Sequence, residues 1–202
     1  MSGKRRSSWR AAATILAAAL PFLGCPRVAP AADVEAGRQK AQACAACHGP
    51  GGNSVIPATP SLSGQPVQFI ETQLIMFREG NRKDPQMSPM AAGLTNAEVK
   101  NLSAYFSAQP VIPPAHVTAP DKTAAGRKLT EQYHCVDCHA PTLHGQQHIP
   151  RLAGQQFEYL RTQLRGFKAT TRFDMDGQMS SVAAPLSDAD IEILADYIAG
   201  MK

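Results

Sequence analysis

The sequence Cys-x-x-Cys-His occurs twice in the chain, at residues 44–48 and 135–139. Two cysteines at this spacing can form thioether bonds with the two vinyl groups of one porphyrin, and the histidine that follows can bind the iron. Each motif therefore predicts one covalently attached c-type haem. The predicted attachment residues are Cys44, Cys47, Cys135 and Cys138, and the predicted proximal ligands are His48 and His139.

Disulfide bonds and zinc sites are the other common uses of paired cysteines. Here each pair is followed directly by histidine, and neither half of the chain contains the second cysteine pair that would complete a four-ligand zinc site. The spacing therefore favours haem over both alternatives.

The second half of the chain repeats the first. Pro-Ser-Leu-Ser-Gly-Gln at residues 60–65 corresponds to Pro-Arg-Leu-Ala-Gly-Gln at residues 150–155, and Thr-Gln-Leu at 72–74 recurs at 162–164. Such tandem similarity indicates two copies of one structural unit. We divide the chain into an N-terminal signal and two cytochrome-like repeats joined by a linker: residues 1–31, 32–108 (the first repeat), 109–120 (the linker) and 121–202 (the second repeat).

The linker contains four prolines. Proline at this density predicts an extended and stiff connector, because the ring stops helix formation and restricts the backbone. His116 lies within the linker, and we expect its side chain to be solvated.

Both repeats are predicted to be helical. Apolar residues recur at helical spacing over residues 69–77 and 159–167, and Thr95 with Glu98 and Ser187 with Asp190 are typical of capping boxes at helix starts. No segment alternates like a strand, so the expected fold class is all-α, with three helices and a long haem-wrapping loop per repeat. The buried stripe of the last helix in each repeat is predicted to consist of Val99, Leu102, Phe106, Ile191, Leu194 and Ile198.

The first 31 residues resemble an export signal. Basic residues at positions 4–10 precede an apolar run at 11–23, and Ala29-Pro30-Ala31 offers a cleavage site before Ala32. We therefore predict a periplasmic protein cleaved near Ala31/Ala32, with lipidation at Cys25 as the alternative. Removing the signal leaves 15 basic and 16 acidic residues, so the formal charge of +4 belongs to the signal and gives no argument for nucleic-acid binding.

The second axial ligand decides whether a haem moves electrons or binds small molecules. Met87 lies seven residues before Leu94, and Met179 lies seven residues before Leu186. The two methionines therefore occupy equivalent positions in the repeats. We predict that Met87 and Met179 are the distal ligands of the two irons.

Other methionines and histidines compete for this role. We expect Met76 and Met90 to fill the core and Met175 to lie in a loop. His144 and His148 lie in the loop that leaves the proximal side of the second haem. Because reaching the opposite face of the porphyrin from there is awkward, we expect both at the haem edge or the surface.

Pro60 and Pro150 each follow a motif histidine by about a dozen residues. A proximal histidine needs an acceptor for its second ring N–H, which fixes the orientation of the ring. We predict that the segments at these prolines supply the carbonyl groups that accept from His48 and His139.

Taken in order, these motifs resemble those of the dihaem cytochrome c4 family, over nearly all of the chain after the signal. The resemblance implies two tandem class I cytochrome c domains, each wrapped around one covalent haem c, with the propionate edges facing. It also implies periplasmic electron transfer, often to a terminal oxidase. One departure is Ala140, where the family usually has glycine, as at Gly49. The second haem loop is therefore expected to differ in shape.

We predict an electron-transfer protein with no catalytic residues of its own. It would carry single electrons from a donor such as a quinol-oxidising complex or a dehydrogenase to an acceptor such as a terminal oxidase, with loose membrane association compatible with this role. The alternative is an electron-accepting cytochrome subunit of a periplasmic dehydrogenase complex, such as a flavocytochrome sulfide dehydrogenase. A dihaem peroxidase would need one open iron, and the paired methionines argue against it.

Overall fold

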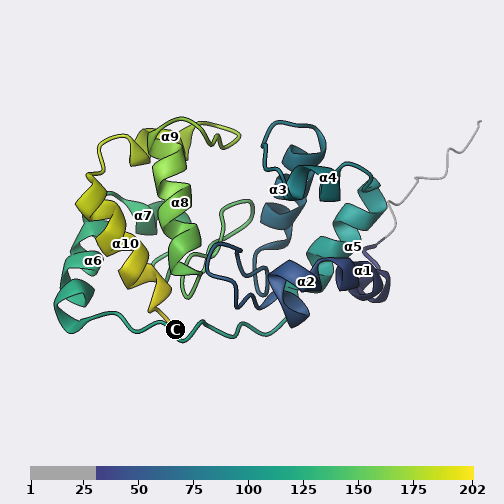
Figure 1. The fold of residues 1–202 in the computed structure, drawn as a ribbon, viewed down its shortest axis with the longest axis horizontal. Helices are drawn as coiled ribbons and strands as arrows, with labels where there is room; N and C mark the ends of the chain where they lie inside the picture. Colours follow the sequence, from purple (N-terminus) through teal and green to yellow (C-terminus); the bar gives the residue numbers. More distant parts are fainter. Residues whose placement is uncertain (1–30) are drawn as a thin grey trace, which may run out of the picture. The chain divides into compact units, whose positions relative to one another are not determined.

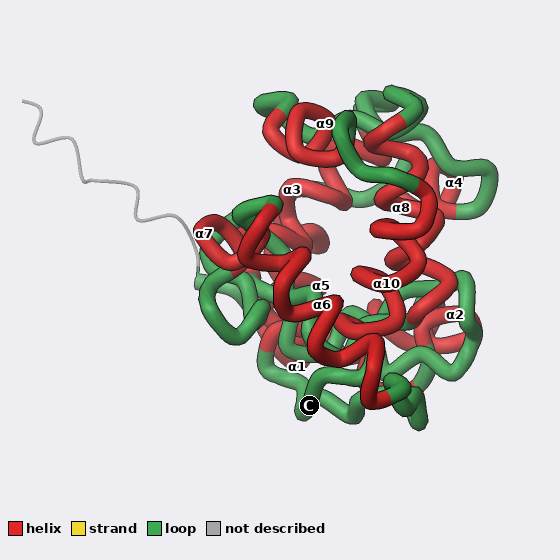
Figure 2. The backbone as a smooth tube through the Cα atoms, turned by 90° about the vertical axis from the view of Figure 1, so that its left-hand side faces the viewer, coloured by secondary structure: helices red, strands yellow, loops and turns green. Residues whose placement is uncertain are grey.

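The computed structural model describes residues 31–202, so Cys25 and nearly all of the predicted signal lie outside the described residues. The described part is built from helices and loops and contains no β-strand (Figure 2). This confirms the all-α prediction. No helix among residues 31–202 is both long and apolar enough to cross a membrane.

Equivalent helices occur in the two repeats, in the same order (Figure 1). The elements of the first repeat are α1 Val34–Lys40, the 3₁₀ turn η1 Ala41–Ala43, α2 Ala45–His48, the 3₁₀ turn η2 Pro50–Gly52, α3 Val67–Arg78, α4 Met87–Ala91 and α5 Asn96–Ser107. The elements of the second repeat are α6 Pro120–Gln132, α7 Cys135–His139, α8 Phe157–Lys168, α9 Gln178–Ala183 and α10 Asp188–Ala199. Helix α6 begins at Pro120, the last residue of the predicted linker, as expected for a proline in the first turn of a helix.

The helices of the second repeat pack in the same way as those of the first. In the first repeat α5 packs against α1 and α3, and α4 lies on α3; in the second, α10 packs against α6 and α8, and α9 lies on α8. Glycine allows the first and last helices of each repeat to approach closely. A Cβ atom on Gly37 would lie 2.1 Å from the carbonyl oxygen of Asn101, and one on Gly126 would lie 2.2 Å from the Cβ of Tyr197.

The last helix of each repeat contributes a stripe of buried apolar side chains to the core. The stripes predicted on α5 and α10 are buried, with every member at most 3% exposed. Both capping boxes form, between Thr95 and Glu98 and between Ser187 and Asp190. The prediction of three helices per repeat missed the short helices α4 and α9, because five or six residues are too few to show a helical period.

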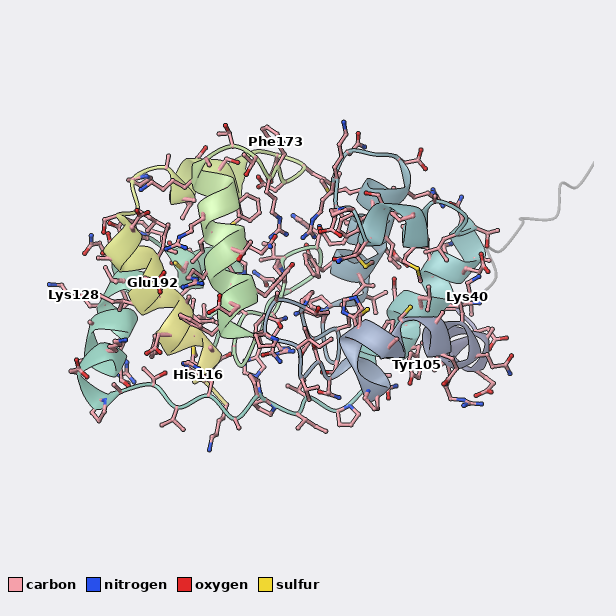
Figure 3. All side chains as sticks on the ribbon, in the orientation of Figure 1. Lys40, Tyr105, His116, Lys128, Phe173 and Glu192 are labelled. Carbon is pink, nitrogen blue, oxygen red and sulfur yellow. The ribbon has the colours of Figure 1, made fainter. Side chains whose placement is uncertain are left out.

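The linker is attached to both repeats. The Asn53 side chain donates to the carbonyl of Pro110 (3.1 Å) and accepts from the N–H of Ile112 (2.8 Å). At the other end, the side chain of His116 lies beside the C-terminal half of α10 (Figure 3). Its Nε2 lies 2.9 Å from a carboxylate oxygen of Asp196, and its ring stacks on Phe157. The prediction of a solvated His116 is therefore wrong, because the side chain is only 25% exposed.

Residues 32–202 form one compact unit in which hydrogen bonds connect the two repeats. Arg82, which follows α3, donates to the hydroxyl of Tyr159 (3.3 Å) and to the side-chain oxygen of Gln163 (3.1 Å), both on α8. The N–H of Tyr159 also donates to the carbonyl of Pro57 (3.2 Å). Helix α8 therefore contacts the first repeat through two of its loops, the one that contains Pro57 and the one that follows α3.

Candidate functional site

The two motif histidines are buried and have equivalent partners. His48 ends α2 and His139 ends α7, and they are 5% and 4% exposed. The Nδ1 atom of each lies 2.8 Å from a backbone carbonyl, that of Pro60 for His48 and that of Pro150 for His139. A neutral imidazole that donates from Nδ1 keeps Nε2 as its metal-binding nitrogen. Burial lowers the pKa of both rings, which favours this neutral form.

All four motif cysteines are free of disulfide bonds. In each pair the first cysteine, Cys44 or Cys135, is partly buried, and the second, Cys47 or Cys138, is exposed. Burial raises the pKa of Cys44, and it raises that of Cys135 to about 11. Thiols in such surroundings are poor thiolate ligands, and no group of three or more His, Cys, Asp or Glu residues within 31–202 is arranged to hold a metal ion.

Met87 and Cys44 both line one apolar cavity in the first repeat. The other residues that line it include Leu74, Leu94 and Leu102. Met87 is partly buried and packs against the core of the first repeat, as Cys44 does. The structure thus brings together the attachment cysteine and the predicted distal methionine at one apolar cavity.

Met90 also lines this cavity, but its side chain is 52% exposed. The expectation that Met90 fills the core is therefore wrong; it follows Met87 by three residues on the short α4 and lies half exposed at the cavity. Met76 is buried, at 6% exposed, as expected for a residue that fills the core.

The second repeat places the equivalent cysteine and methionine against its own core. Cys135 and Met179 are partly buried and pack against one hydrophobic core, together with Leu164. Met175, which we expected to lie in a loop, precedes α9 and is 75% exposed. Met179 is therefore the more buried of the two methionines, as the alignment of the repeats predicts for the candidate ligand.

Two aspartates hold the backbone next to these methionines, and the sequence analysis did not find them. The carboxylate of Asp84 accepts from the N–H groups of Gln86 (2.9 Å) and Met87 (2.8 Å), and that of Asp174 accepts from the N–H of Met179 (2.8 Å). Asp84 lies three residues before Met87, and Asp174 lies five residues before Met179, so the two aspartates do not occupy equivalent positions in the repeats. The sequence does contain a signal for them, an aspartate shortly before each candidate ligand, because aspartate commonly caps the first turn of a helix.

The competing histidines lie at the surface. His144 is exposed, and its Nδ1 lies 3.0 Å from the carbonyl of Thr142. His148 is exposed and lines an open surface cavity of about 500 Å³ with Glu71, Ile75 and Met175.

Ala140 has nearly the same backbone conformation as its counterpart Gly49. The φ and ψ angles are 69° and 158° at Ala140, and 76° and 168° at Gly49. The second haem loop therefore leaves its histidine in the same way as the first, so the expected difference in shape is wrong at this residue. The loops diverge further on, where Gln146 and Ile149 form a β-bridge in the second repeat only.

These observations fit a haem in each repeat. A buried neutral histidine oriented by a carbonyl, a pair of free cysteines and a partly buried methionine are present in both, and the histidine and methionine are the usual axial pair of electron-transfer cytochromes c. Apolar side chains surround the cysteine and methionine, as required for packing against a porphyrin.

Comparisons with known proteins agree. The family described as cytochrome c matches residues 34–109 and again residues 123–202. Cytochrome c4 of Thiocapsa roseopersicina is 38% identical over 182 residues, which cover 84% of this chain and 93% of that protein. The crystal structure of reduced recombinant cytochrome c4 from Pseudomonas stutzeri matches with a TM-score of 0.79 and 33% identity, over 85% of this chain and all of that chain.

A third relative has a different name. The thiosulfate dehydrogenase electron acceptor of Thiomonas intermedia (strain K12) is 33% identical, over 79% of each chain. The family match across both repeats, each with its Cys-x-x-Cys-His motif, means that the chain carries two covalent haem c groups. The chain belongs to the cytochrome c family and, within it, to the dihaem cytochromes c4, which are electron-transfer proteins and not enzymes.

Proposed function

We propose that this protein carries single electrons in the periplasm between a donor complex and a terminal oxidase. The observation that carries the proposal is the duplicated set of candidate axial ligands, a buried histidine and a partly buried methionine in each repeat. With both axial positions filled by the protein, neither iron has an open site for peroxide or oxygen. Each haem supplies one reversible electron transfer at its iron.

In this proposal each repeat holds its haem with the same set of residues. Thioether bonds form at Cys44 and Cys47 in the first repeat and at Cys135 and Cys138 in the second, and the axial pairs are His48 with Met87 and His139 with Met179. A thioether ligand favours ferrous iron and raises the reduction potential relative to two nitrogen ligands. The domains would be residues 32–108 and 121–202, joined by the linker 109–120.

The carbonyls of Pro60 and Pro150 orient the two proximal rings. A histidine that donates a hydrogen bond to a carbonyl has a fixed tautomer and ring plane, and its basicity toward the metal increases. Both distances are 2.8 Å. The two irons would therefore meet similar proximal ligands.

The proposed location follows from the signal-like N-terminus, with cleavage near Ala31/Ala32. The near-neutral charge of residues 32–202 favours docking through a local patch and brief complexes over strong long-range steering. Redox protein partners are implied by the family, and the terminal oxidase is the acceptor that we propose.

The test mixes the reduced protein with hydrogen peroxide and, separately, with membranes that contain a terminal oxidase. We expect slow stoichiometric oxidation by peroxide at most, and rapid oxidation by the membranes that an oxidase inhibitor abolishes. Fast catalytic consumption of peroxide by the intact protein would contradict the carrier function.

The electron acceptor of a dehydrogenase is the second candidate, and the similarity to a thiosulfate dehydrogenase electron acceptor favours it. In that case the oxidised protein should be reduced rapidly by a thiosulfate dehydrogenase with thiosulfate, and it should co-purify with such an enzyme. Co-purification with a flavoprotein would instead favour the flavocytochrome type of complex. Reduction by quinol-oxidising membranes without thiosulfate supports the first proposal.

A further inference from the structure

Two glutamines at equivalent positions of the repeats each reach into the other repeat. Gln155 accepts from the backbone N–H of Ser61 (2.7 Å) and donates to its carbonyl (2.9 Å). Gln65 makes the same pair of bonds with Arg151, both at 2.9 Å. All four residues are 2% exposed, so these bonds are shielded from water.

The peptide groups that the glutamines bind are the ones that orient the proximal histidines. The peptide between Pro60 and Ser61 accepts from His48 at its carbonyl and donates its N–H to Gln155. The peptide between Pro150 and Arg151 accepts from His139 and donates to Gln65. Each candidate proximal ligand is therefore connected through one peptide group to a glutamine of the opposite repeat.

A peptide group transmits such a contact in two ways. It is planar and stiff, so a bond that holds its N–H also holds the direction of its carbonyl. Hydrogen bonds in series polarise one another, so a carbonyl whose own N–H is engaged is a stronger acceptor, and a buried site of low dielectric strengthens the effect. A stronger acceptor makes the imidazole more electron-rich and stabilises ferric iron.

We infer that Gln65 and Gln155 are positioning residues that set the proximal hydrogen bond of the haem in the opposite repeat. Gln155 acts on the haem of the first repeat through His48, and Gln65 acts on the haem of the second through His139. The inference rests on the proposed role of these histidines as iron ligands. The reduction potential of each haem therefore depends on contact with the other repeat.

The experiment replaces each glutamine with methionine, which has a similar volume but neither accepts nor donates as an amide does. The matched control is Gln156→Met. Gln156 is the buried neighbour of Gln155, and its side chain also crosses to the first repeat, where it donates to the carbonyl of Ser54 and not to the 60–61 peptide. The two readouts are a redox titration and the proton NMR shifts of the haem methyl groups in the oxidised protein, each haem being assigned through its contacts with its own repeat.

With Gln155→Met, the methyl shifts of the first haem should change and its potential should rise, while the second haem stays as in the unsubstituted protein. With Gln65→Met, the second haem should change in this way and the first should stay as in the unsubstituted protein. Gln156→Met should change neither haem. Equal changes in the methyl shifts and potentials of both haems in all three variants would mean a general loosening of the interface and would overturn the inference. Unchanged methyl shifts and potentials in the Gln65 and Gln155 variants would also overturn it.

If a methionine variant does not take up both haems, Gln155→Asn and Gln65→Asn replace it, because asparagine keeps the amide but is one methylene too short to reach. The same one-haem change is expected, and unchanged methyl shifts would again overturn the inference. Failure of the proposed function looks different: His48→Ala or His139→Ala would leave the spectrum of its haem unchanged, whatever the glutamine variants do.

Discussion

At the scale of single residues, Ala140 has a backbone conformation that its counterpart in the first repeat leaves to glycine. Its φ of 69° and ψ of 158° lie in a region that is essentially reserved for glycine. The first repeat has Gly49 there, where a Cβ atom would lie 2.0 Å from the carbonyl oxygen of Asn53. The second repeat carries an alanine in the same conformation and bears the strain.

Replacing Ala140 with glycine should therefore stabilise the protein. Relief of a strain of about 1–3 kcal/mol, less the entropy that glycine adds to the unfolded chain, leaves a gain of about 1 kcal/mol. Calorimetry should show Tm higher by about 2–4 °C. The reverse change, Gly49→Ala, should lower Tm because of the clash, and an unchanged or lower Tm for Ala140→Gly would contradict the strain.

At the scale of elements, the longer helices could be predicted from the sequence, and the short ones could not. The stripe on α5 and the capping box at Thr95 are local patterns that act within one helix. Helices α4 and α9 have no such pattern; they form where Asp84 and Asp174 hold backbone N–H groups before Met87 and Met179. Met90 lies on the short helix α4, so its exposure could not be inferred from the spacing of apolar residues alone.

The aspartates should therefore control how firmly the methionines are held. Asp84→Ala removes a cap worth about 1 kcal/mol and should let added imidazole displace the methionine of the first haem at a lower concentration. The measurement is an imidazole titration of the near-infrared iron–sulfur band of the oxidised protein. Asp33→Ala is the control, because it removes a side-chain cap from another helix, α1, which carries neither methionine. Equal imidazole sensitivity of the two variants would show that Asp84 has no such role.

The capping box of α5 gives a pH dependence. Hydrogen bonds from Lys40 and from Thr95 lower the pKa of Glu98 from 4.5 to about 2. Because the folded-state pKa is the lower one, the contribution of this carboxylate to stability is complete above about pH 4.5 and is lost as the pH falls towards 2. Urea unfolding should show Glu98→Gln less stable than the unsubstituted protein at pH 7, with the difference closing by pH 2. A difference that grows on acidification would contradict this assignment.

At the scale of the whole molecule, the two repeats and the two haem motifs could be read from the sequence, whereas the contacts between repeats could not. His116 meets Asp196, and Gln155 meets Ser61, only after residues 80 and 94 positions apart are brought together by folding. The Gln that ends each Pro-x-Leu-x-Gly-Gln segment was visible as part of a repeat, but its partner was not.

Each repeat has its own hydrophobic core, against which its own motif cysteine and methionine pack, so loss of one haem should be local. Replacing Cys135 and Cys138 with alanine should give a protein whose mass exceeds that of the polypeptide by one haem. The second repeat should be less helical and more sensitive to protease, because the partly buried Cys135 and Met179 would have no porphyrin to pack against. The first haem should still take up one electron reversibly. Loss of both haems would show that the repeats do not assemble independently.

In the proposed function, the protein provides both axial ligands of both irons, so each haem carries one electron and neither iron has an open site. A reductive titration of the purified oxidised protein, followed by its near-infrared iron–sulfur band, tests this most directly. We expect uptake of two electrons per chain, loss of the band in two equal parts, and low-spin iron throughout. A high-spin haem in the oxidised protein, or a band that accounts for only one iron, would contradict it.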